Sequence, residues 1–111
     1  KILLIGVAYK RDVDDVRESP ALAIIHELER RLARVFYHDP HVPLLRSRHL
    51  HREMRSVLLT PELTRSCDAA LIVTDHSSID YSMLLENCRL LIDSRNATAP
   101  YRKPEHNVIL A

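Results

Sequence analysis

The sequence predicts a small open α/β domain, with a Rossmann-like parallel sheet flanked by helices. Short apolar runs alternate with segments of helical periodicity, and each helical segment opens with its own start signal. The chain has 111 residues, 46% of them hydrophobic, which is enough to bury one core but not two. We therefore expect a single domain over residues 1–111.

Four short apolar runs predict the strands. Each is rich in branched or aromatic residues and too short for a helix, as in a sheet that is covered on both faces. The runs are Ile2 to Val7, Arg34 to Tyr37, Ala69 to Val73 and Leu90 to Ile92. Because helical segments separate them, we expect the strands to be parallel.

The first predicted helix is the longest. Ser19 followed by Pro20 indicates an N-cap with proline at the first helical position. Apolar residues then recur at helical spacing for about three turns. They are Ala21, Ile24, Ile25, Leu28 and Leu32.

Two further helices have cap signals, and one segment has no regular pattern. Thr60 before Pro61 predicts a brief helix towards Cys67, and Asp80 predicts the cap of another helix. Residues 39–59 contain two prolines and predict a long loop with at most one helical turn.

Composition excludes several classes of partner. The net charge is only +1, which argues against nucleic acid and anionic membranes, and no apolar run has the length of a membrane span. Cys67 and Cys88 are too few for a disulfide framework, so we expect free structural thiols and a cytoplasmic location. Lys1 leads straight into a strand without an initiator Met, which suggests a piece of a longer polypeptide.

Cations follow the first and fourth predicted strands, where ligands of open parallel sheets bind. Gly6 is the only glycine, so side chains rather than a glycine-rich loop would have to hold a phosphate. Lys10 and Arg17 lie between a strand and a helix, and Arg95 belongs to the same edge of the sheet as Lys10. They predict a pyrophosphate site, with solvated surface cations as the alternative.

Several other patterns allow competing interpretations. The loop carboxylates Asp12, Asp14 and Asp15 invite a calcium or magnesium site, but they lack the EF-hand spacing and more simply orient Lys10, Arg11 and Arg17. The loop Tyr37-His38-Asp39-Pro40-His41 suits either a contact with a ribose or a base, or a turn shaped by Asp39-Pro40.

Histidines, a potential triad and an arginine cluster offer further alternatives. His38, His41, His49 and His51 suggest zinc, against a solvated loop with no cysteine nearby. Asp75, His76 and Ser77 hold the ingredients of a hydrolase, but neighbours in sequence rarely converge as a triad. Arg46, Arg48, Arg52 and Arg55 suggest RNA, but without interleaved aromatic residues.

Three motifs together resemble a known family. The stretch Gly6-Val7-Ala8-Tyr9-Lys10, continued by Asp12, Asp14-Asp15 and Arg17-Glu18-Ser19-Pro20, is similar to the start of the C-terminal domain of the UDP-glucose/GDP-mannose dehydrogenase family. Tyr37-His38-Asp39-Pro40 and Asp93-Ser94-Arg95-Asn96 follow in the family's order. The form of the first motif is most similar to the UDP-N-acetylhexosamine branch.

The resemblance implies a UDP-sugar-binding domain of an NAD-dependent UDP-sugar 6-dehydrogenase. Tyr9, Lys10 and Arg95 would contact the uridine diphosphate, and Arg17 would reach NAD. The catalytic cysteine and lysine, the N-terminal NAD-binding domain and the central domain would lie outside this chain, which contributes no catalytic residue and no metal site. The parent enzyme is expected to be a homo-oligomer.

The resemblance also has a gap and a competitor. Where relatives usually carry glycine after the long helix, this chain has Leu32-Ala33, so the end of that helix lacks its usual cap. The competing function is a module of the same fold that has lost its ligand and serves only in oligomer contacts.

Overall fold

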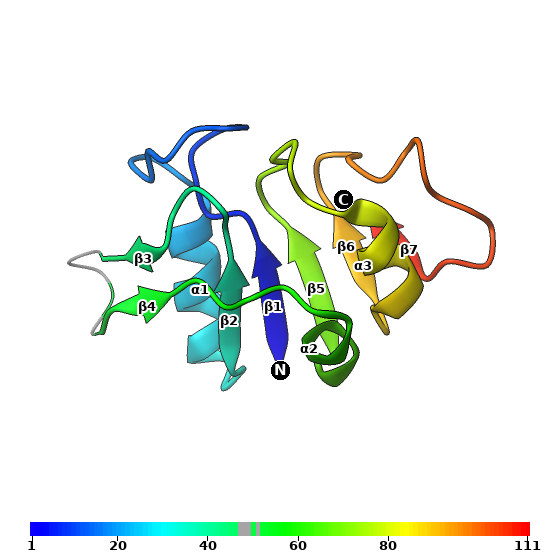
Figure 1. Ribbon diagram of the computed structural model, residues 1–111. Coiled ribbons are helices and arrows are strands. Elements are labelled where there is room, and N and C mark those ends of the chain that lie inside the picture. The colour runs from blue at the N-terminus through cyan, green and yellow to red at the C-terminus, as the bar shows by residue number, and fades with distance from the viewer. Residues whose placement is uncertain (47–49, 51) are drawn as a thin grey trace.

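A computed structural model describes residues 1–46, 50 and 52–111. Five parallel strands form the main sheet, in the order β2-β1-β5-β6-β7 (Figure 1). These strands are β1 (Ile2–Ile5), β2 (Val35–His38), β5 (Ala69–Ile72), β6 (Leu91–Asp93) and β7 (Val108–Leu110). The remaining elements are α1 (Ala21–Arg30), β3 (Leu44–Leu45), β4 (Met54–Arg55), α2 (Pro61–Ser66) and α3 (Tyr81–Asn87). The predicted α/β fold class is confirmed.

Helices cover both faces of the sheet, as the near-continuous apolar strands require. In Figure 1, α1 lies behind the sheet, whereas α2 and α3 lie in front. Leu4 of the interior strand β1 packs into the core cluster that includes α1. Its neighbours Leu3 and Ile5 pack into the cluster that includes α3. Alternate side chains of one strand thus fill two separate cores.

Helix α1 starts one residue later than predicted. Pro20 occupies the N-cap position, and the Ser19 hydroxyl accepts a hydrogen bond from the Ala21 N–H at 3.1 Å. The caps of the shorter helices are confirmed: Thr60 accepts from the Leu63 N–H, and Asp80 accepts from a backbone N–H of α3, each at 3.1 Å.

The end of α1 is closed by a leucine in a conformation that favours glycine. Leu32 has a φ of 68° and its side chain is 91% exposed. The Ala33 N–H donates to the Leu28 carbonyl, and the Leu32 N–H donates to the Glu29 carbonyl. This is the hydrogen-bond pattern of a Schellman motif. The helix therefore ends in the usual way without the usual glycine, at a cost in backbone energy.

Two features of the fold were not predicted. Residues 39–59, expected to be a loop, contain the antiparallel pair β3 and β4, in which Leu45 lies opposite Met54 and both side chains are buried. A fifth strand, β7, pairs with β6 through Val108 and Leu91.

Gly6 lets the chain leave β1 close to the neighbouring strand. Its φ is 82°, and a Cβ at this position would lie 2.5 Å from the Thr74 carbonyl oxygen.

Both cysteines are free, as predicted; Cys67 is buried, and burial raises the pKa of the Cys88 thiol to about 12. Among the helices of the described residues, none is both long enough and apolar enough to cross a membrane.

Candidate functional site

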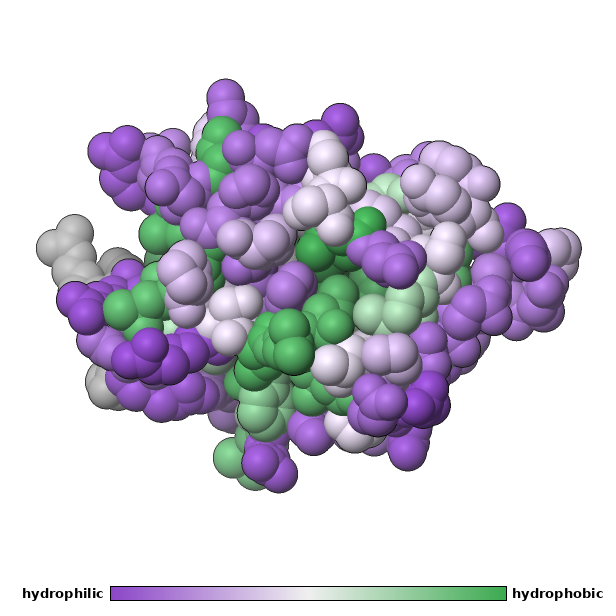
Figure 2. Space-filling model, in the orientation of Figure 1, coloured by the Kyte–Doolittle hydropathy of each residue, from purple (hydrophilic) through white to green (hydrophobic). Residues whose placement is uncertain are grey.

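The candidate site lies at the carboxyl edge of the sheet, beside the strand where the order reverses. β1 is flanked by β2 on one side and β5 on the other, and ligands of open α/β sheets bind outside such a switch point. The loops that follow β1, β5 and β6 reach this edge at the top of Figure 1. Figure 2 shows mainly hydrophilic side chains there, in contrast to the apolar middle of the same face.

Asp75 joins two arginines across this edge. It follows β5, its side chain is 8% exposed, and its Oδ2 accepts a hydrogen bond from the Arg11 guanidinium. Its Oδ1 lies 3.6 Å from Nε of Arg95 and has no hydrogen-bond partner among the described residues. Burial alone would raise the pKa of Asp75, but Arg11 above all, and also Arg95, lower it overall. The carboxylate therefore stays ionised and holds both cations.

The loop that carries Arg95 is organised by a second buried carboxylate. Oδ1 of Asp93 accepts from the backbone N–H groups of Arg95 and Ala97, each at 3.1 Å. Its Oδ2 accepts from the Thr98 N–H at 2.9 Å and the Thr98 hydroxyl at 2.7 Å. Burial opposes ionisation of Asp93, but these hydrogen bonds lower its pKa overall. Asp93 thus holds the backbone of Arg95 in place.

Asp39, a candidate ribose contact in the sequence, instead links three loops through hydrogen bonds. Its side chain is fully buried, and Oδ2 accepts from the Val7 and Ala8 N–H groups and from Nε2 of His76 at 2.9 Å. Oδ1 accepts from the His41 N–H at 2.8 Å. The carboxylate therefore ties the loops after β1, β2 and β5 together, and it does not face a ligand.

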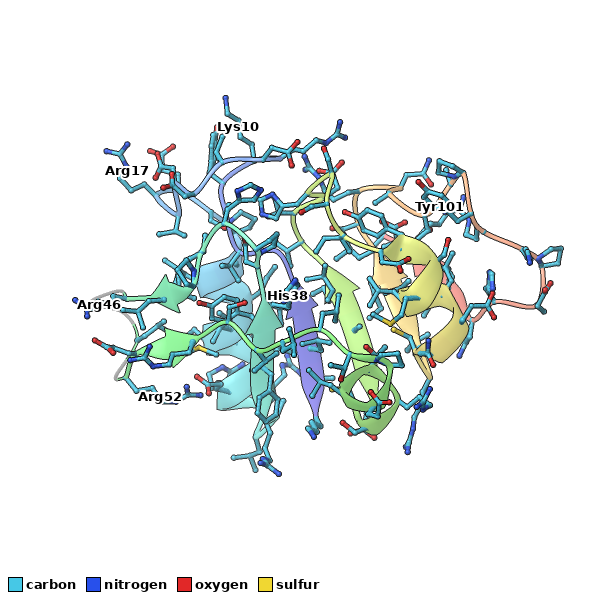
Figure 3. The ribbon with its side chains drawn as sticks, in the orientation of Figure 1. Lys10, Arg17, His38, Arg46, Arg52 and Tyr101 are labelled. Atoms are coloured by element: carbon cyan, nitrogen blue, oxygen red, sulfur yellow. The ribbon has the colours of Figure 1, made fainter. Side chains whose placement is uncertain are left out.

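Tyr9 and Lys10 are presented to solvent. The Tyr9 N–H donates to the Asp15 carbonyl at 2.7 Å, and the Tyr9 side chain is 52% exposed. Lys10 points away from the domain in Figure 3 and has no ion-pair partner among the described residues. Lys10 and Arg95 belong to loops at the same edge, as predicted from the strand order, and the cation that shares a carboxylate with Arg95 is Arg11.

Arg17 is oriented by Asp15, as the sequence predicts for the loop carboxylates. Its Nε donates to Oδ1 at 3.0 Å and its NH2 group donates to Oδ2 at 2.9 Å. These hydrogen bonds lower the pKa of Asp15 to about 2. Together with Tyr9 and Glu18, the pair lines a hollow of about 310 Å³. Figure 3 shows the Arg17 side chain pointing outward from the upper edge of the domain.

The hydrolase alternative is not supported by the geometry. His76 is completely buried; its Nε2 contacts Asp39, and its Nδ1 accepts from the Asp12 N–H at 2.9 Å. The Ser77 hydroxyl donates to Asp12, and Asp75 faces Arg11. His76 and Ser77 thus both contact Asp12, Asp75 contacts Arg11, and no hydrogen bond joins the three neighbours in sequence as a triad would require.

The structure gives other partners to one histidine of the zinc alternative and to two arginines of the RNA alternative. His38 Nδ1 lies 2.7 Å from the Val57 carbonyl oxygen, while Arg46 pairs with Glu53 and Arg52 with Glu29. His49, His51 and Arg48 lie outside the described residues.

Comparison with known proteins identifies the family of the chain. Residues 3–100 match the model of the UDP-glucose/GDP-mannose dehydrogenase family, UDP binding domain. The chain belongs to this family. The resemblance carried by its three motifs is therefore confirmed.

Individual relatives cover the same range. A UDP-glucose 6-dehydrogenase from Rhizobium meliloti is 32% identical over 95% of this chain and 24% of its own length. A UDP-N-acetyl-D-mannosamine dehydrogenase from Pyrococcus horikoshii is 31% identical over 86% of this chain and 21% of its own length. A solved structure of a UDP-D-ManNAc dehydrogenase from Pyrococcus horikoshii has a TM-score of 0.66 at 28% identity, covering 98% of this chain and 24% of that one. The chain thus spans about a quarter of the length of these relatives.

The sequence analysis treats Arg11 only as a cation oriented by carboxylates of its own loop, and considers Asp75 only for a hydrolase. A signal was available, because Asp75 directly follows a predicted strand and Arg11 belongs to the loop of the adjacent one. Side chains at the carboxyl ends of neighbouring parallel strands meet at one edge, so this ion pair is the kind of contact that topology predicts.

Proposed function

We propose that this chain binds the uridine diphosphate of a UDP-sugar at the carboxyl edge of its sheet. Tyr9, Lys10 and Arg95 would make the contacts. The observation that carries the proposal is the arrangement of Arg95, whose backbone is held by Asp93 and whose guanidinium lies beside Asp75. A preoriented arginine loses less entropy when it binds a phosphate than a free one does.

Three cations at this edge can contact an anion. Arg11 and Arg95 share the carboxylate of Asp75, and Lys10 has no ion-pair partner among the described residues. Charge-assisted hydrogen bonds to phosphate are roughly twice as strong as neutral ones. The half-exposed ring of Tyr9 beside Lys10 offers an apolar face to a base or a sugar.

Within a whole protein, we infer that this domain serves an NAD-dependent UDP-sugar 6-dehydrogenase with further NAD-binding and central domains. NAD would accept hydride from the sugar C6 position. The chain does not fit a dinucleotide by itself, since Gly6 is its only glycine and no glycine-rich loop precedes α1. Its part would be limited to an edge contact from Arg17, and the catalytic groups would come from other domains.

The choice of sugar follows from the family resemblance alone. The first motif favours a UDP-N-acetylhexosamine, and the relatives include enzymes named for UDP-N-acetyl-D-mannosamine and for UDP-glucose. A homo-oligomeric parent enzyme and a cytoplasmic location belong to the same proposal.

Matched substitutions test the site. Removing one charge-assisted contact costs about 1.5–3 kcal/mol, so Arg95→Ala and Lys10→Ala should each weaken UDP binding by about 10-fold to 150-fold in calorimetric titration. Arg89→Ala and Lys103→Ala remove equally exposed cations away from this edge and should leave the affinity unchanged. If Arg95→Ala and Lys10→Ala both bind UDP as tightly as the unmodified chain, the assignment is wrong.

A further inference from the structure

Three potential metal ligands meet at the carboxyl edge from three different loops. Asp12 follows β1, His41 follows β2 and His76 follows β5, and one ligand atom from each lies within 4.8 Å of the other two. Oδ1 of Asp12 is 3.8 Å from Nδ1 of His76 and 3.9 Å from Nε2 of His41. The rings of His41 and His76 lie with their centroids 4.6 Å apart.

The buried member of this group is held in the form that a metal needs. Nε2 of His76 lies 2.9 Å from Oδ2 of Asp39, and both side chains are completely buried. The Asp12 N–H donates to Nδ1 of His76, so Nδ1 carries a lone pair and the proton resides on Nε2. A histidine whose outer N–H binds a carboxylate is the usual arrangement behind a metal-ligating imidazole.

We propose that Asp12, His41 and His76 form a binding site for a divalent transition metal ion of the zinc type. Two imidazole nitrogens and one carboxylate oxygen are donors that suit zinc, whereas magnesium and calcium prefer oxygen ligands only. Three protein ligands leave a fourth position open towards the edge of the sheet. This inference does not depend on UDP binding.

Closing the site requires movement of the two exposed ligands. Metal–ligand bonds of about 2.0–2.2 Å place tetrahedral ligands roughly 3.3 Å apart, so the two separations from Asp12 have to shrink by about half an ångström. The ligand atoms of His41 and His76 lie within 4.8 Å of each other, so this separation has to shrink by at most about 1.5 Å. His76 stays fixed by Asp39, so the 44% and 36% exposed side chains of Asp12 and His41 move, and Asp12 does so against the hydrogen bonds that it accepts from Ser77. The Asp12 N–H gives up its bond to Nδ1.

The site unites two groups of residues that the sequence could only treat separately. The carboxylates around Asp12 suggest a calcium or magnesium site, and the histidines around His41 suggest a zinc site. Neither group by itself supplies a complete set of ligands. The missing ligand is His76, which topology brings in from the loop after β5. A bound ion would therefore link the loops after β1, β2 and β5 and stabilise the folded chain.

The test is titration of the metal-free chain with Co²⁺ followed by competition with Zn²⁺. We expect saturable one-to-one binding, with the visible absorption of a four-coordinate Co²⁺ site. We also expect no sulfur charge-transfer band, because none of the three ligands is a cysteine. His41→Ala and Asp12→Asn should each weaken Zn²⁺ binding at least tenfold.

Matched variants separate this site from chance binding to other histidines. His26→Ala removes an exposed histidine of α1, and Asp14→Asn removes an exposed carboxylate of the same loop. Both should keep the unmodified affinity. The proposal is overturned if no saturable binding occurs, if either ligand variant binds Zn²⁺ like the unmodified chain, or if a control variant loses as much affinity as His41→Ala.

Discussion

Replacing Leu32 by glycine should stabilise the chain, although the substitution removes a large side chain. Leu32 closes the Schellman motif at the end of α1 with a φ of 68°. A residue with a Cβ pays about 1–2 kcal/mol for this left-handed conformation, and glycine does not. Because the leucine side chain is 91% exposed, its removal sacrifices almost no buried apolar area.

The net gain is smaller than the relief of strain. Glycine gives the unfolded chain extra conformational freedom, which lowers the free energy of unfolding by about 0.5–1 kcal/mol. The free energy of unfolding should therefore rise by about 0.5–1 kcal/mol. In a domain of this size that corresponds to an increase in Tm of about 3 °C.

Urea and thermal unfolding followed by circular dichroism measure this change. Leu32→Ala is the matched control, because it removes the side chain but keeps the backbone strain, and its stability should stay within about 0.5 kcal/mol of the unmodified chain. If Leu32→Gly is no more stable than Leu32→Ala, the explanation by backbone strain fails.

Two further predictions concern the carboxyl edge of the sheet. Gly6→Ala should destabilise the chain by about 3 kcal/mol or more, because the new Cβ would meet the Thr74 carbonyl at 2.5 Å and the φ of 82° disfavours any side chain; a urea midpoint within error of the original would contradict this. Acid should weaken the fold, since the pKa values of buried Asp39 and Asp93 are lower in the folded state than in the unfolded one. Their contribution is complete above the unfolded pKa of about 3.9 and is lost as the pH falls through the folded values, so unchanged urea stability from about pH 6 to pH 3 would refute their role.

Local signals in the sequence were sufficient for most elements of the fold. Thr60 and Asp80 cap their helices as expected, because a cap depends on a side chain and a backbone N–H three residues away. Ser19 also acts as expected on the Ala21 N–H, but the helix starts after Pro20. Boundaries of this kind shift by a residue because end geometry depends on the surrounding loop.

The missed strands differ in their local signal. β7 is the apolar run Val108–Leu110, as short as the run that predicts β6, so the sequence did contain a signal for it. The pair β3 and β4 is even shorter, and its register joins Leu45 to Met54 across a segment rich in charged residues. For this pair, contact between residues distant in the sequence decides the structure, which composition and periodicity cannot reveal.

The sequence predicts which loops meet at the candidate site, but not the side-chain contacts between them. Topology places Arg95 and the loop after β1 together, and the sequence anticipated this. Arg95 pairs with Asp75, and the cation of the loop after β1 that also pairs with Asp75 is Arg11. This contact depends on the directions of the side chains, which the sequence does not give. The burial of Asp39 likewise follows from three loops converging on one carboxylate.

The central claim is that this chain alone forms a site for uridine diphosphate. Calorimetric titration with UDP, in the presence of a metal chelator and with ATP at the same ionic strength as the comparison, tests it most directly. We predict saturable one-to-one binding of UDP that is tighter than that of ATP. No saturable binding, or equal binding of both nucleotides, would contradict the claim and favour a module that serves only in oligomer contacts.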